Sequence, residues 1–115
     1  MADYDVVVVG GGMVGMSFAL DFVKKQNKKI AIIDNNAINP KISKDFHTRV
    51  SAINIASEKY LQELGVWQNI SRKRPFSCVK VWDQNSHGSI NFHAKEENLT
   101  HLGNIIENNI IKSAL

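Results

Sequence analysis

Three glycines and one carboxylate near the N-terminus have the types and spacing of a dinucleotide-binding site. Gly10, Gly12 and Gly15 follow directly on an apolar run that begins at Val6, and Asp34 ends the next apolar run. Glycine at these positions permits a sharp turn, a close approach of the backbone to a pyrophosphate, and close packing of the following helix. A carboxylate about 20 residues farther on can accept hydrogen bonds from the ribose hydroxyls of an adenosine. The pattern therefore predicts a site for the adenosine diphosphate end of a cofactor.

A strand, a helix and a second strand must position these residues. Residues 6–9 show no polar alternation, which is typical of a central parallel strand covered on both faces. Residues 13–23 carry apolar side chains at helical spacing, the polar residues 24–27 end that helix, and residues 30–33 form the second strand. The helix N-terminus would offer free N–H groups and a positive dipole end to the phosphates. The alternative is a glycine-rich turn in an ordinary α/β domain, which leaves the placement of Asp34 unexplained.

Composition limits the class of protein. A chain of 115 residues with 43% hydrophobic content can bury one small core and has no room for two full domains. The net charge of +3 is scattered, and the run 72–74 is expected to be a solvated turn, so nucleic acid is not an expected partner. Cys78 is the only cysteine and the four histidines lack ligand spacing, so no disulfide and no metal site are expected within the chain. With no signal-peptide pattern and no bilayer-length segment, the expected location is cytoplasmic.

The middle of the chain predicts a loop and then a helix. Residues 35–45 are polar and contain a proline, which is typical of a loop. Ser51 or Asn54 could cap a helix that runs to Leu64, with Gly65 as its stop. The apolar face of that helix would consist of Ile53, Ala56, Tyr60, Leu61 and Leu64.

The last third of the chain predicts a hairpin and a second amphipathic helix. Residues 66–67 are expected to form a hydrophobic clasp, and Pro75 is expected to break the chain. Residues 78–82 and 89–92 have the pattern of two strands joined by a longer hairpin loop. Residues 102–115 place isoleucines and leucines at helical spacing, which predicts a helix.

Four stretches together resemble a known family. The opening YDVVVVGGGMVG, residues 4–15, resembles the start of the flavoprotein aromatic hydroxylases. TRVSAIN at 48–54, LGVW at 64–67 and LGNIIEN at 102–108 are similar to the ubiquinone-biosynthesis hydroxylases, which add a hydroxyl to a polyprenyl-substituted phenol ring. The resemblance covers nearly the whole chain. Many FAD and NAD proteins share the first motif, whereas the second and fourth are fairly specific to this branch.

The resemblance implies an FAD-dependent monooxygenase that uses NAD(P)H and oxygen. NAD(P)H would reduce the bound FAD, and the reduced flavin would activate oxygen and deliver one atom of it to the ring, while the protein supplies position and excludes water. By this match the FAD pyrophosphate would be held by Gly10, Gly12 and Gly15, and the neighbouring Met13 and Val14 would also belong to the cofactor-binding residues.

The same match assigns three more cofactor contacts. Asp34 would bind the adenosine ribose, where the family more often has glutamate, so the shorter side chain implies a small shift or a bridging water. Arg49 matches an arginine that approaches the pyrophosphate and flavin, and a surface salt bridge is its structural alternative. Asn104 and Asn108 would lie on the face of the last helix that comes near FAD, although the second of these is often arginine in the wider group.

The resemblance also divides the chain and describes an incomplete α/β fold. Residues 1–74 would be the first part of a Rossmann-like FAD-binding domain, built from the βαβ unit and the helix that follows it. Residues 75–100 would be a β-hairpin that starts the substrate-domain sheet, and residues 101–115 the return helix of the FAD-binding domain. Trp82 and Phe92 could line a substrate site, but core packing is expected for both.

Family members are longer, so the chain is expected to be an N-terminal portion whose partner is the remainder of the hydroxylase. The catalytic residues would lie in that remainder. This portion alone is expected to be inactive and marginally stable, because its hairpin edges and apolar face lack cover. A polyprenyl phenol substrate favours peripheral contact with the inner membrane or with a biosynthetic complex. Two alternatives stay open: an NAD-dependent dehydrogenase with the same fingerprint, and a non-catalytic nucleotide-binding fragment.

Overall fold

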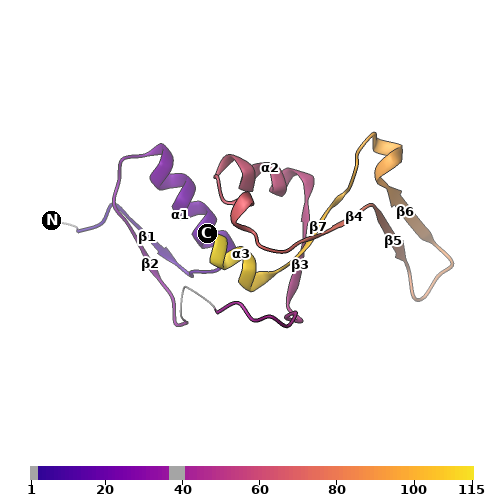
Figure 1. Ribbon diagram of the computed structural model, residues 1–115, viewed down its shortest axis with the longest axis horizontal. Helices are drawn as coiled ribbons and strands as arrows, with labels where there is room; N and C mark the ends of the chain where they lie inside the picture. Colours follow the sequence, from indigo (N-terminus) through magenta and orange to yellow (C-terminus); the bar gives the residue numbers. More distant parts are fainter. Residues whose placement is uncertain (1–2, 37–40) are drawn as a thin grey trace.

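The computed structural model describes residues 3–36 and 41–115 and shows a mixed α/β chain. The molecule is elongated, with extents of 61 × 31 × 30 Å. A strand–helix–strand unit lies at one end, a small antiparallel sheet with two helices lies in the middle, and a hairpin projects from the other end (Figure 1). The α/β class expected from the sequence is therefore confirmed.

The N-terminal unit consists of β1 (Val6–Val9), α1 (Met13–Lys25) and β2 (Ile30–Ile33). The two strands pair in parallel, as the sequence predicted, and α1 ends two residues beyond the predicted helix. The expected cover on both faces of β1 is wrong, because Val7 is 52% exposed and Val9 is 84% exposed. Among the described residues α1 packs against this strand pair, and Val7 and Val9 alternate with the less exposed Val6 and Val8, so they project from the opposite, open face.

Helix α2 (Ile55–Glu63) begins at Asn54, one of the two caps that the sequence offered. The Asn54 side chain accepts a hydrogen bond from the Ser57 N–H at 2.9 Å. Ser51 is not the cap, because it lies within strand β3 (Val50–Asn54). Gly65 ends the helix as predicted, with a φ of +79° that favours glycine.

A three-stranded antiparallel sheet, in the order β3–β7–β4, forms the middle of the molecule. It contains β4 (Arg74–Phe76) and β7 (Gly103–Glu107), and β7 is followed by α3 (Asn108–Ala114). The prediction of one helix over 102–115 is therefore wrong in its first half. Strand β7 pairs along both of its edges, and this pairing overrides an apolar spacing that also suits a helix. Pro75 does not break the chain either, because it lies in the edge strand β4, where proline is tolerated.

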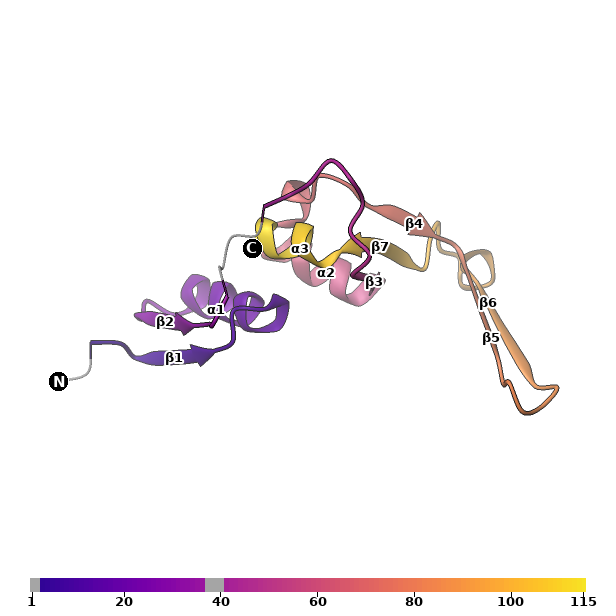
Figure 2. The same cartoon turned by 90° about the horizontal axis from the view of Figure 1, so that it is seen from below.

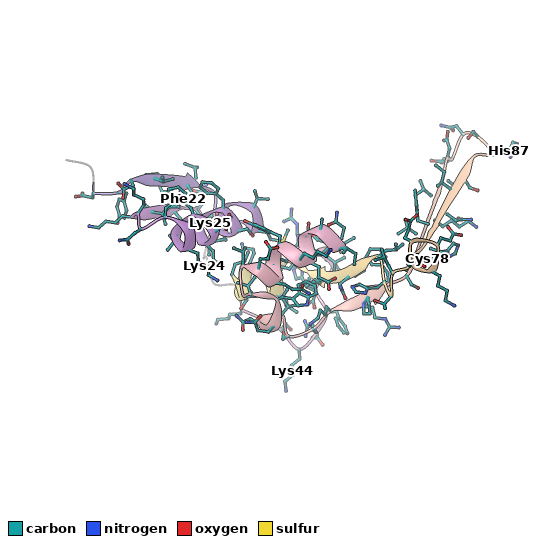
Figure 3. The ribbon with its side chains drawn as sticks, turned by 90° about the horizontal axis from the view of Figure 1, so that it is seen from above. Phe22, Lys24, Lys25, Lys44, Cys78 and His87 are labelled. Carbon is teal, nitrogen blue, oxygen red and sulfur yellow. The ribbon has the colours of Figure 1, made fainter. Side chains whose placement is uncertain are left out.

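The hydrophobic core lies between α2, β7 and α3. Its buried side chains are Leu61, Leu64, Val66, Ile70, Ile106, Ile110 and Ile111. Trp67, in the short 3-10 helix η1 (Trp67–Asn69), packs against this cluster, which confirms the predicted clasp of residues 66–67. Helix α1 is tied to the core region because Lys24 extends toward it and donates to the Leu64 carbonyl (Figure 3).

The predicted hairpin is confirmed as β5 (Cys78–Trp82) and β6 (Ser89–His93), with the short 3-10 helix η2 (Ala94–Glu97) after it. It projects away from the rest of the molecule (Figure 2). The register pairs Val79 with Phe92 and Val81 with Ile90, so one face of the ribbon is apolar. Core packing of Trp82 and Phe92 is wrong for the described chain, since they are 68% and 52% exposed.

The loop expected over residues 35–45 lies partly outside the described residues, and its described parts contain no helix or strand. In the part of the chain that the structure describes, no helix is long and apolar enough to cross a membrane.

Gly103 is the tightest point of the middle sheet and provides a test of it. A Cβ at this position would lie 2.3 Å from the Ile53 carbonyl oxygen and 2.9 Å from the Phe76 ring. We expect Gly103→Ala to lower the free energy of unfolding by about 1–3 kcal/mol, measured by urea denaturation, because β3 must move to admit the methyl group. The control is Gly88→Ala, whose Cβ would meet only the Ser86 hydroxyl at 3.4 Å. Equal losses in the two variants would contradict this account of the sheet.

Candidate cofactor site

The glycine turn between β1 and α1 has the geometry that the fingerprint predicted. Gly10 has a φ of +106°, and its N–H donates to the Ile33 carbonyl of β2 at 2.7 Å. A Cβ at Gly15 would lie 2.0 Å from the Gly10 carbonyl oxygen, so only glycine lets α1 approach the turn this closely. A Cβ at Gly12 would meet nothing within 4 Å. The backbone at Gly12 therefore borders open space in which another molecule can approach it.

The first turn of α1 leaves its backbone N–H groups available to a ligand. Gly12 is the N-cap and has no side chain to satisfy them, and the first turn contains no acidic residue. Such an end attracts anions through its N–H groups and its dipole. Met13 packs against the core, whereas Val14 is 84% exposed. Met13 can therefore offer a ligand its backbone rather than its side chain.

Asp34 lies at the same turn, as the sequence predicted. Its carboxylate accepts hydrogen bonds from the Gly11 N–H at 2.6 Å and from the Asn36 N–H at 2.7 Å. The hydrogen bond from Asn36, followed by that from Gly11, lowers the pKa of the Asp34 carboxyl below its ordinary value. The group is therefore ionised at neutral pH. The structure brings together an acidic acceptor and a helix N-terminus that are separated by about 20 residues in the chain.

The other predicted contacts lie elsewhere than expected. Arg49 precedes β3, its side chain is exposed, and it forms no ion pair with any of the described residues, so the surface salt bridge is not observed. Asn104 lies in β7, not on a helix, and its buried amide donates to the Glu58 carboxylate at 3.1 Å. Asn108 begins α3 and accepts from the Ser51 hydroxyl at 2.6 Å. Within the described residues, no hydrogen bond joins Arg49 or Asn104 to the glycine turn.

Sequence reasoning missed a polar cluster at the edge of the core. His101 Nε2 lies 2.8 Å from Glu58 Oε2, and His101 Nδ1 lies 2.8 Å from the Thr100 hydroxyl. Glu58 and His101, together with Asn104, border an open cleft of about 690 Å³. More than 40 residues separate Glu58 from His101, so no local spacing could reveal the cluster.

Sequence reasoning also missed a nearly buried ion pair. Glu107 is 6% exposed, and its carboxylate contacts Arg72 Nε at 2.5 Å and Arg72 Nη2 at 2.7 Å. The expected solvated turn over residues 72–74 is therefore wrong for Arg72, whereas Lys73 and Arg74 are exposed as expected. The Arg72 hydrogen bond, followed by one from the His47 N–H, lowers the pKa of Glu107 from 4.5 to about 2. A charged residue directly after two isoleucines was the one sequence signal of a buried carboxylate.

No metal centre is apparent in residues 3–36 and 41–115, where no three histidine, cysteine, aspartate or glutamate side chains gather to hold an ion. Cys78 is free and lies at the base of the hairpin, whereas His87 lies at its far tip (Figure 3).

The fold and the glycine turn define a class, a mixed α/β protein whose N-terminal unit is a parallel β–α–β arrangement with a glycine turn before the helix. No protein-family model matches the chain. Comparison with individual known proteins defines its class more closely. The chain is 38% identical to the human mitochondrial ubiquinone biosynthesis monooxygenase COQ6 over 119 residues, which cover 97% of this chain and 25% of that protein. It is 31% identical to the Escherichia coli 3-demethoxyubiquinol 3-hydroxylase over 115 residues, which cover 96% of this chain and 29% of that protein. The chain is thus homologous to ubiquinone-biosynthesis hydroxylases, as its motifs predicted, and it spans about a quarter of their length.

The depressed pKa of Glu107 provides a test of the ion pair. Its folded-state pKa of about 2 is below the ordinary 4.5, so the stability that it contributes is present above pH 4.5 and is lost as the pH falls toward 2. We expect Glu107→Gln to flatten this part of the pH profile of the free energy of unfolding, measured by urea denaturation at a series of pH values. The exposed Glu97→Gln is the matched control and should keep the wild-type profile. A wild-type acid profile in Glu107→Gln would show that the ion pair does not form.

Proposed function

We propose that this chain is the FAD-binding N-terminal part of an FAD-dependent monooxygenase that hydroxylates a polyprenyl phenol in ubiquinone biosynthesis. The observation that carries the proposal is the Asp34 carboxylate held at a ligand-accessible glycine turn in a homologue of ubiquinone hydroxylases. The homologues are named as monooxygenases and hydroxylases, which does not favour a nicotinamide-dependent dehydrogenase. The division into residues 1–74, 75–100 and 101–115 as parts of FAD-binding, substrate and again FAD-binding domains belongs to this proposal.

The described residues fit the adenosine diphosphate end of FAD. The open backbone at Gly12 and the uncapped N–H groups of α1 suit the pyrophosphate oxygens. The Asp34 carboxylate has about four acceptor positions. Two of them accept the N–H groups of Gly11 and Asn36, and the other two can accept from the ribose hydroxyls.

Arg49 and Asn104 are two further proposed contacts, and we expect them to contribute unequally. The exposed Arg49 has a guanidinium that suits phosphate oxygens in a bidentate arrangement. Asn104 would have to exchange its hydrogen bond to Glu58 for one to the cofactor, so we expect the smaller contribution from it.

When bound, FAD would accept electrons from NAD(P)H and make oxygen reactive toward an electron-rich ring. The part of the reaction that falls to these residues is to bind and orient the cofactor. The glycine turn would fix the pyrophosphate against a rigid helix end, and Asp34 would fix the adenosine. Such positioning lowers the entropic cost of bringing the flavin and the substrate together.

Exposed apolar surfaces support the idea that more polypeptide packs on this chain. Val9 of β1 and Ile90 of β6 are 84% and 59% exposed, on two sheets at opposite ends of the molecule. We propose that the remainder of the hydroxylase covers both. A polyprenyl tail partitions into lipid, so the enzyme would meet its substrate peripherally at a membrane surface or in a biosynthetic complex.

Nucleotide binding provides the direct test of the site. Because the glycine turn and Asp34 contact only the adenosine diphosphate end, we expect the chain to bind FAD and ADP weakly but with similar affinity, and riboflavin not at all. Gly12→Val should weaken FAD binding by at least about tenfold, since a branched side chain would occupy the open space at the backbone. Calorimetric titration measures the affinity, and circular dichroism checks that the fold is intact. Gly88→Val in the hairpin loop is the control, and equal FAD affinity in the two variants would remove the glycine turn from the proposal.

A chimera tests the reaction. We expect the E. coli 3-demethoxyubiquinol 3-hydroxylase to keep forming ubiquinone in a strain that lacks the native enzyme when this chain replaces its matched segment. The same chimera with Gly12→Val should form none, because it should lose its flavin. Quinones extracted from the cells measure the outcome. A folded, flavin-loaded chimera with no product would contradict the proposed function.

A further inference from the structure

The segment before β3 is held by side chains rather than by regular secondary structure. Residues 41–49 contain no helix or strand, and Lys44 points away from the body of the molecule (Figure 3). On the inner side, Arg72 Nη2 donates to the Asp45 carbonyl at 3.1 Å, and the guanidinium lies 4.9 Å from the centre of the Phe46 ring. The backbone of this segment is therefore bound to one arginine.

Glu107 completes the same attachment from strand β7. Its Oε1 accepts the His47 N–H at 2.7 Å, while both of its oxygens accept from Arg72. A nearly buried carboxylate is stable only when it is paired and hydrogen-bonded. Glu107 therefore holds Arg72 in one orientation, and the two side chains bind the segment together.

The attachment continues on both sides of Arg49. Two residues before it, the His47 N–H is bound to Glu107, and the Arg49 carbonyl itself accepts from the Asn108 N–H at 3.0 Å. Two residues after it, Ser51 donates to the Asn108 side chain. Only the exposed side chain of Arg49 is left free of ion pairs within the described residues.

We propose that Arg72 and Glu107 are positioning residues that fix the backbone of residues 45–49 and so determine how the Arg49 side chain is presented. That Arg49 meets a phosphate-bearing cofactor rests on the proposed function. The fixed backbone does not depend on it. The fork of Arg72 is essential here, because one guanidinium binds a carboxylate and backbone carbonyls at once, which a lysine ammonium cannot do in the same geometry.

Protection of the segment in the chain without cofactor tests the positioning role. Trypsin can cleave after Lys44 and after Arg49, and after Lys95 in η2 as an internal reference. We expect Glu107→Gln and Arg72→Lys to raise cleavage after Lys44 and Arg49 about tenfold relative to Lys95, because the segment then opens locally. Asp21→Asn, which removes the exposed pair with Lys25, is the matched control and should change nothing.

Hydrogen exchange in the unmodified chain provides a measurement that no misfolded variant can obscure. We expect the His47 and Asn108 amides to be protected, although neither N–H lies within a strand or helix ladder. Exchange of the His47 amide at the rate of a free peptide would overturn the proposal. If the His47 amide in Arg72→Lys were as well protected as in the unmodified chain, the role of the guanidinium fork would be overturned.

A double-mutant cycle on ADP affinity separates positioning from general stability. If Glu107 acts through Arg49, Arg49→Ala and Glu107→Gln should each weaken ADP binding, and the double variant should bind no more weakly than Arg49→Ala alone. Additive losses with the segment still protected would overturn the proposal. If even the unmodified chain binds no ADP, the proposed function fails, and the protection pattern alone decides whether the segment is fixed by this ion pair.

Discussion

Pairing of strand β7 along both of its edges is the interaction on which the middle of the molecule depends. The strand hydrogen-bonds to β3 on one side and to β4 on the other, and these neighbours come from segments about 50 and 30 residues earlier in the chain. Its side chains then serve different tasks. Ile106 enters the core, Asn104 binds Glu58, and Glu107 binds Arg72. Gly103 lets β3 and Phe76 approach closely.

The strand–helix–strand end depends on a different constraint, the absence of a side chain at Gly15. Because the helix can approach the carbonyl of Gly10, its N-terminus is directed to the turn where Asp34 also lies. This end has few buried side chains of its own, and it joins the core through Lys24 and through Met13 and Leu20 of α1. The unit is thus joined to the core by few contacts, and the glycine turn that we propose as the FAD site lies on it.

In the amphipathic hairpin the two strands are paired along their length, but the apolar face of the ribbon is exposed. Val79, Val81, Ile90 and Phe92 share that face through their register. Isolated two-stranded ribbons are marginal in water, so the hairpin gains stability only when this face is covered. In a ubiquinone hydroxylase, the same face is a suitable surface for the substrate domain that we propose.

The sequence by itself determined the parts that local sterics and short-range periodicity control. These are the glycine turn, the parallel pair that ends on Asp34, the stop at Gly65 and the hairpin. Only the tertiary structure decided that residues 103–107 form a strand, because their apolar spacing suits a helix equally well until partners on both edges supply the hydrogen bonds. It also decided that Arg72 binds Glu107 and that Asn104 binds Glu58, since a buried charge or amide selects its partner by proximity in space, across 35 and 46 residues of chain.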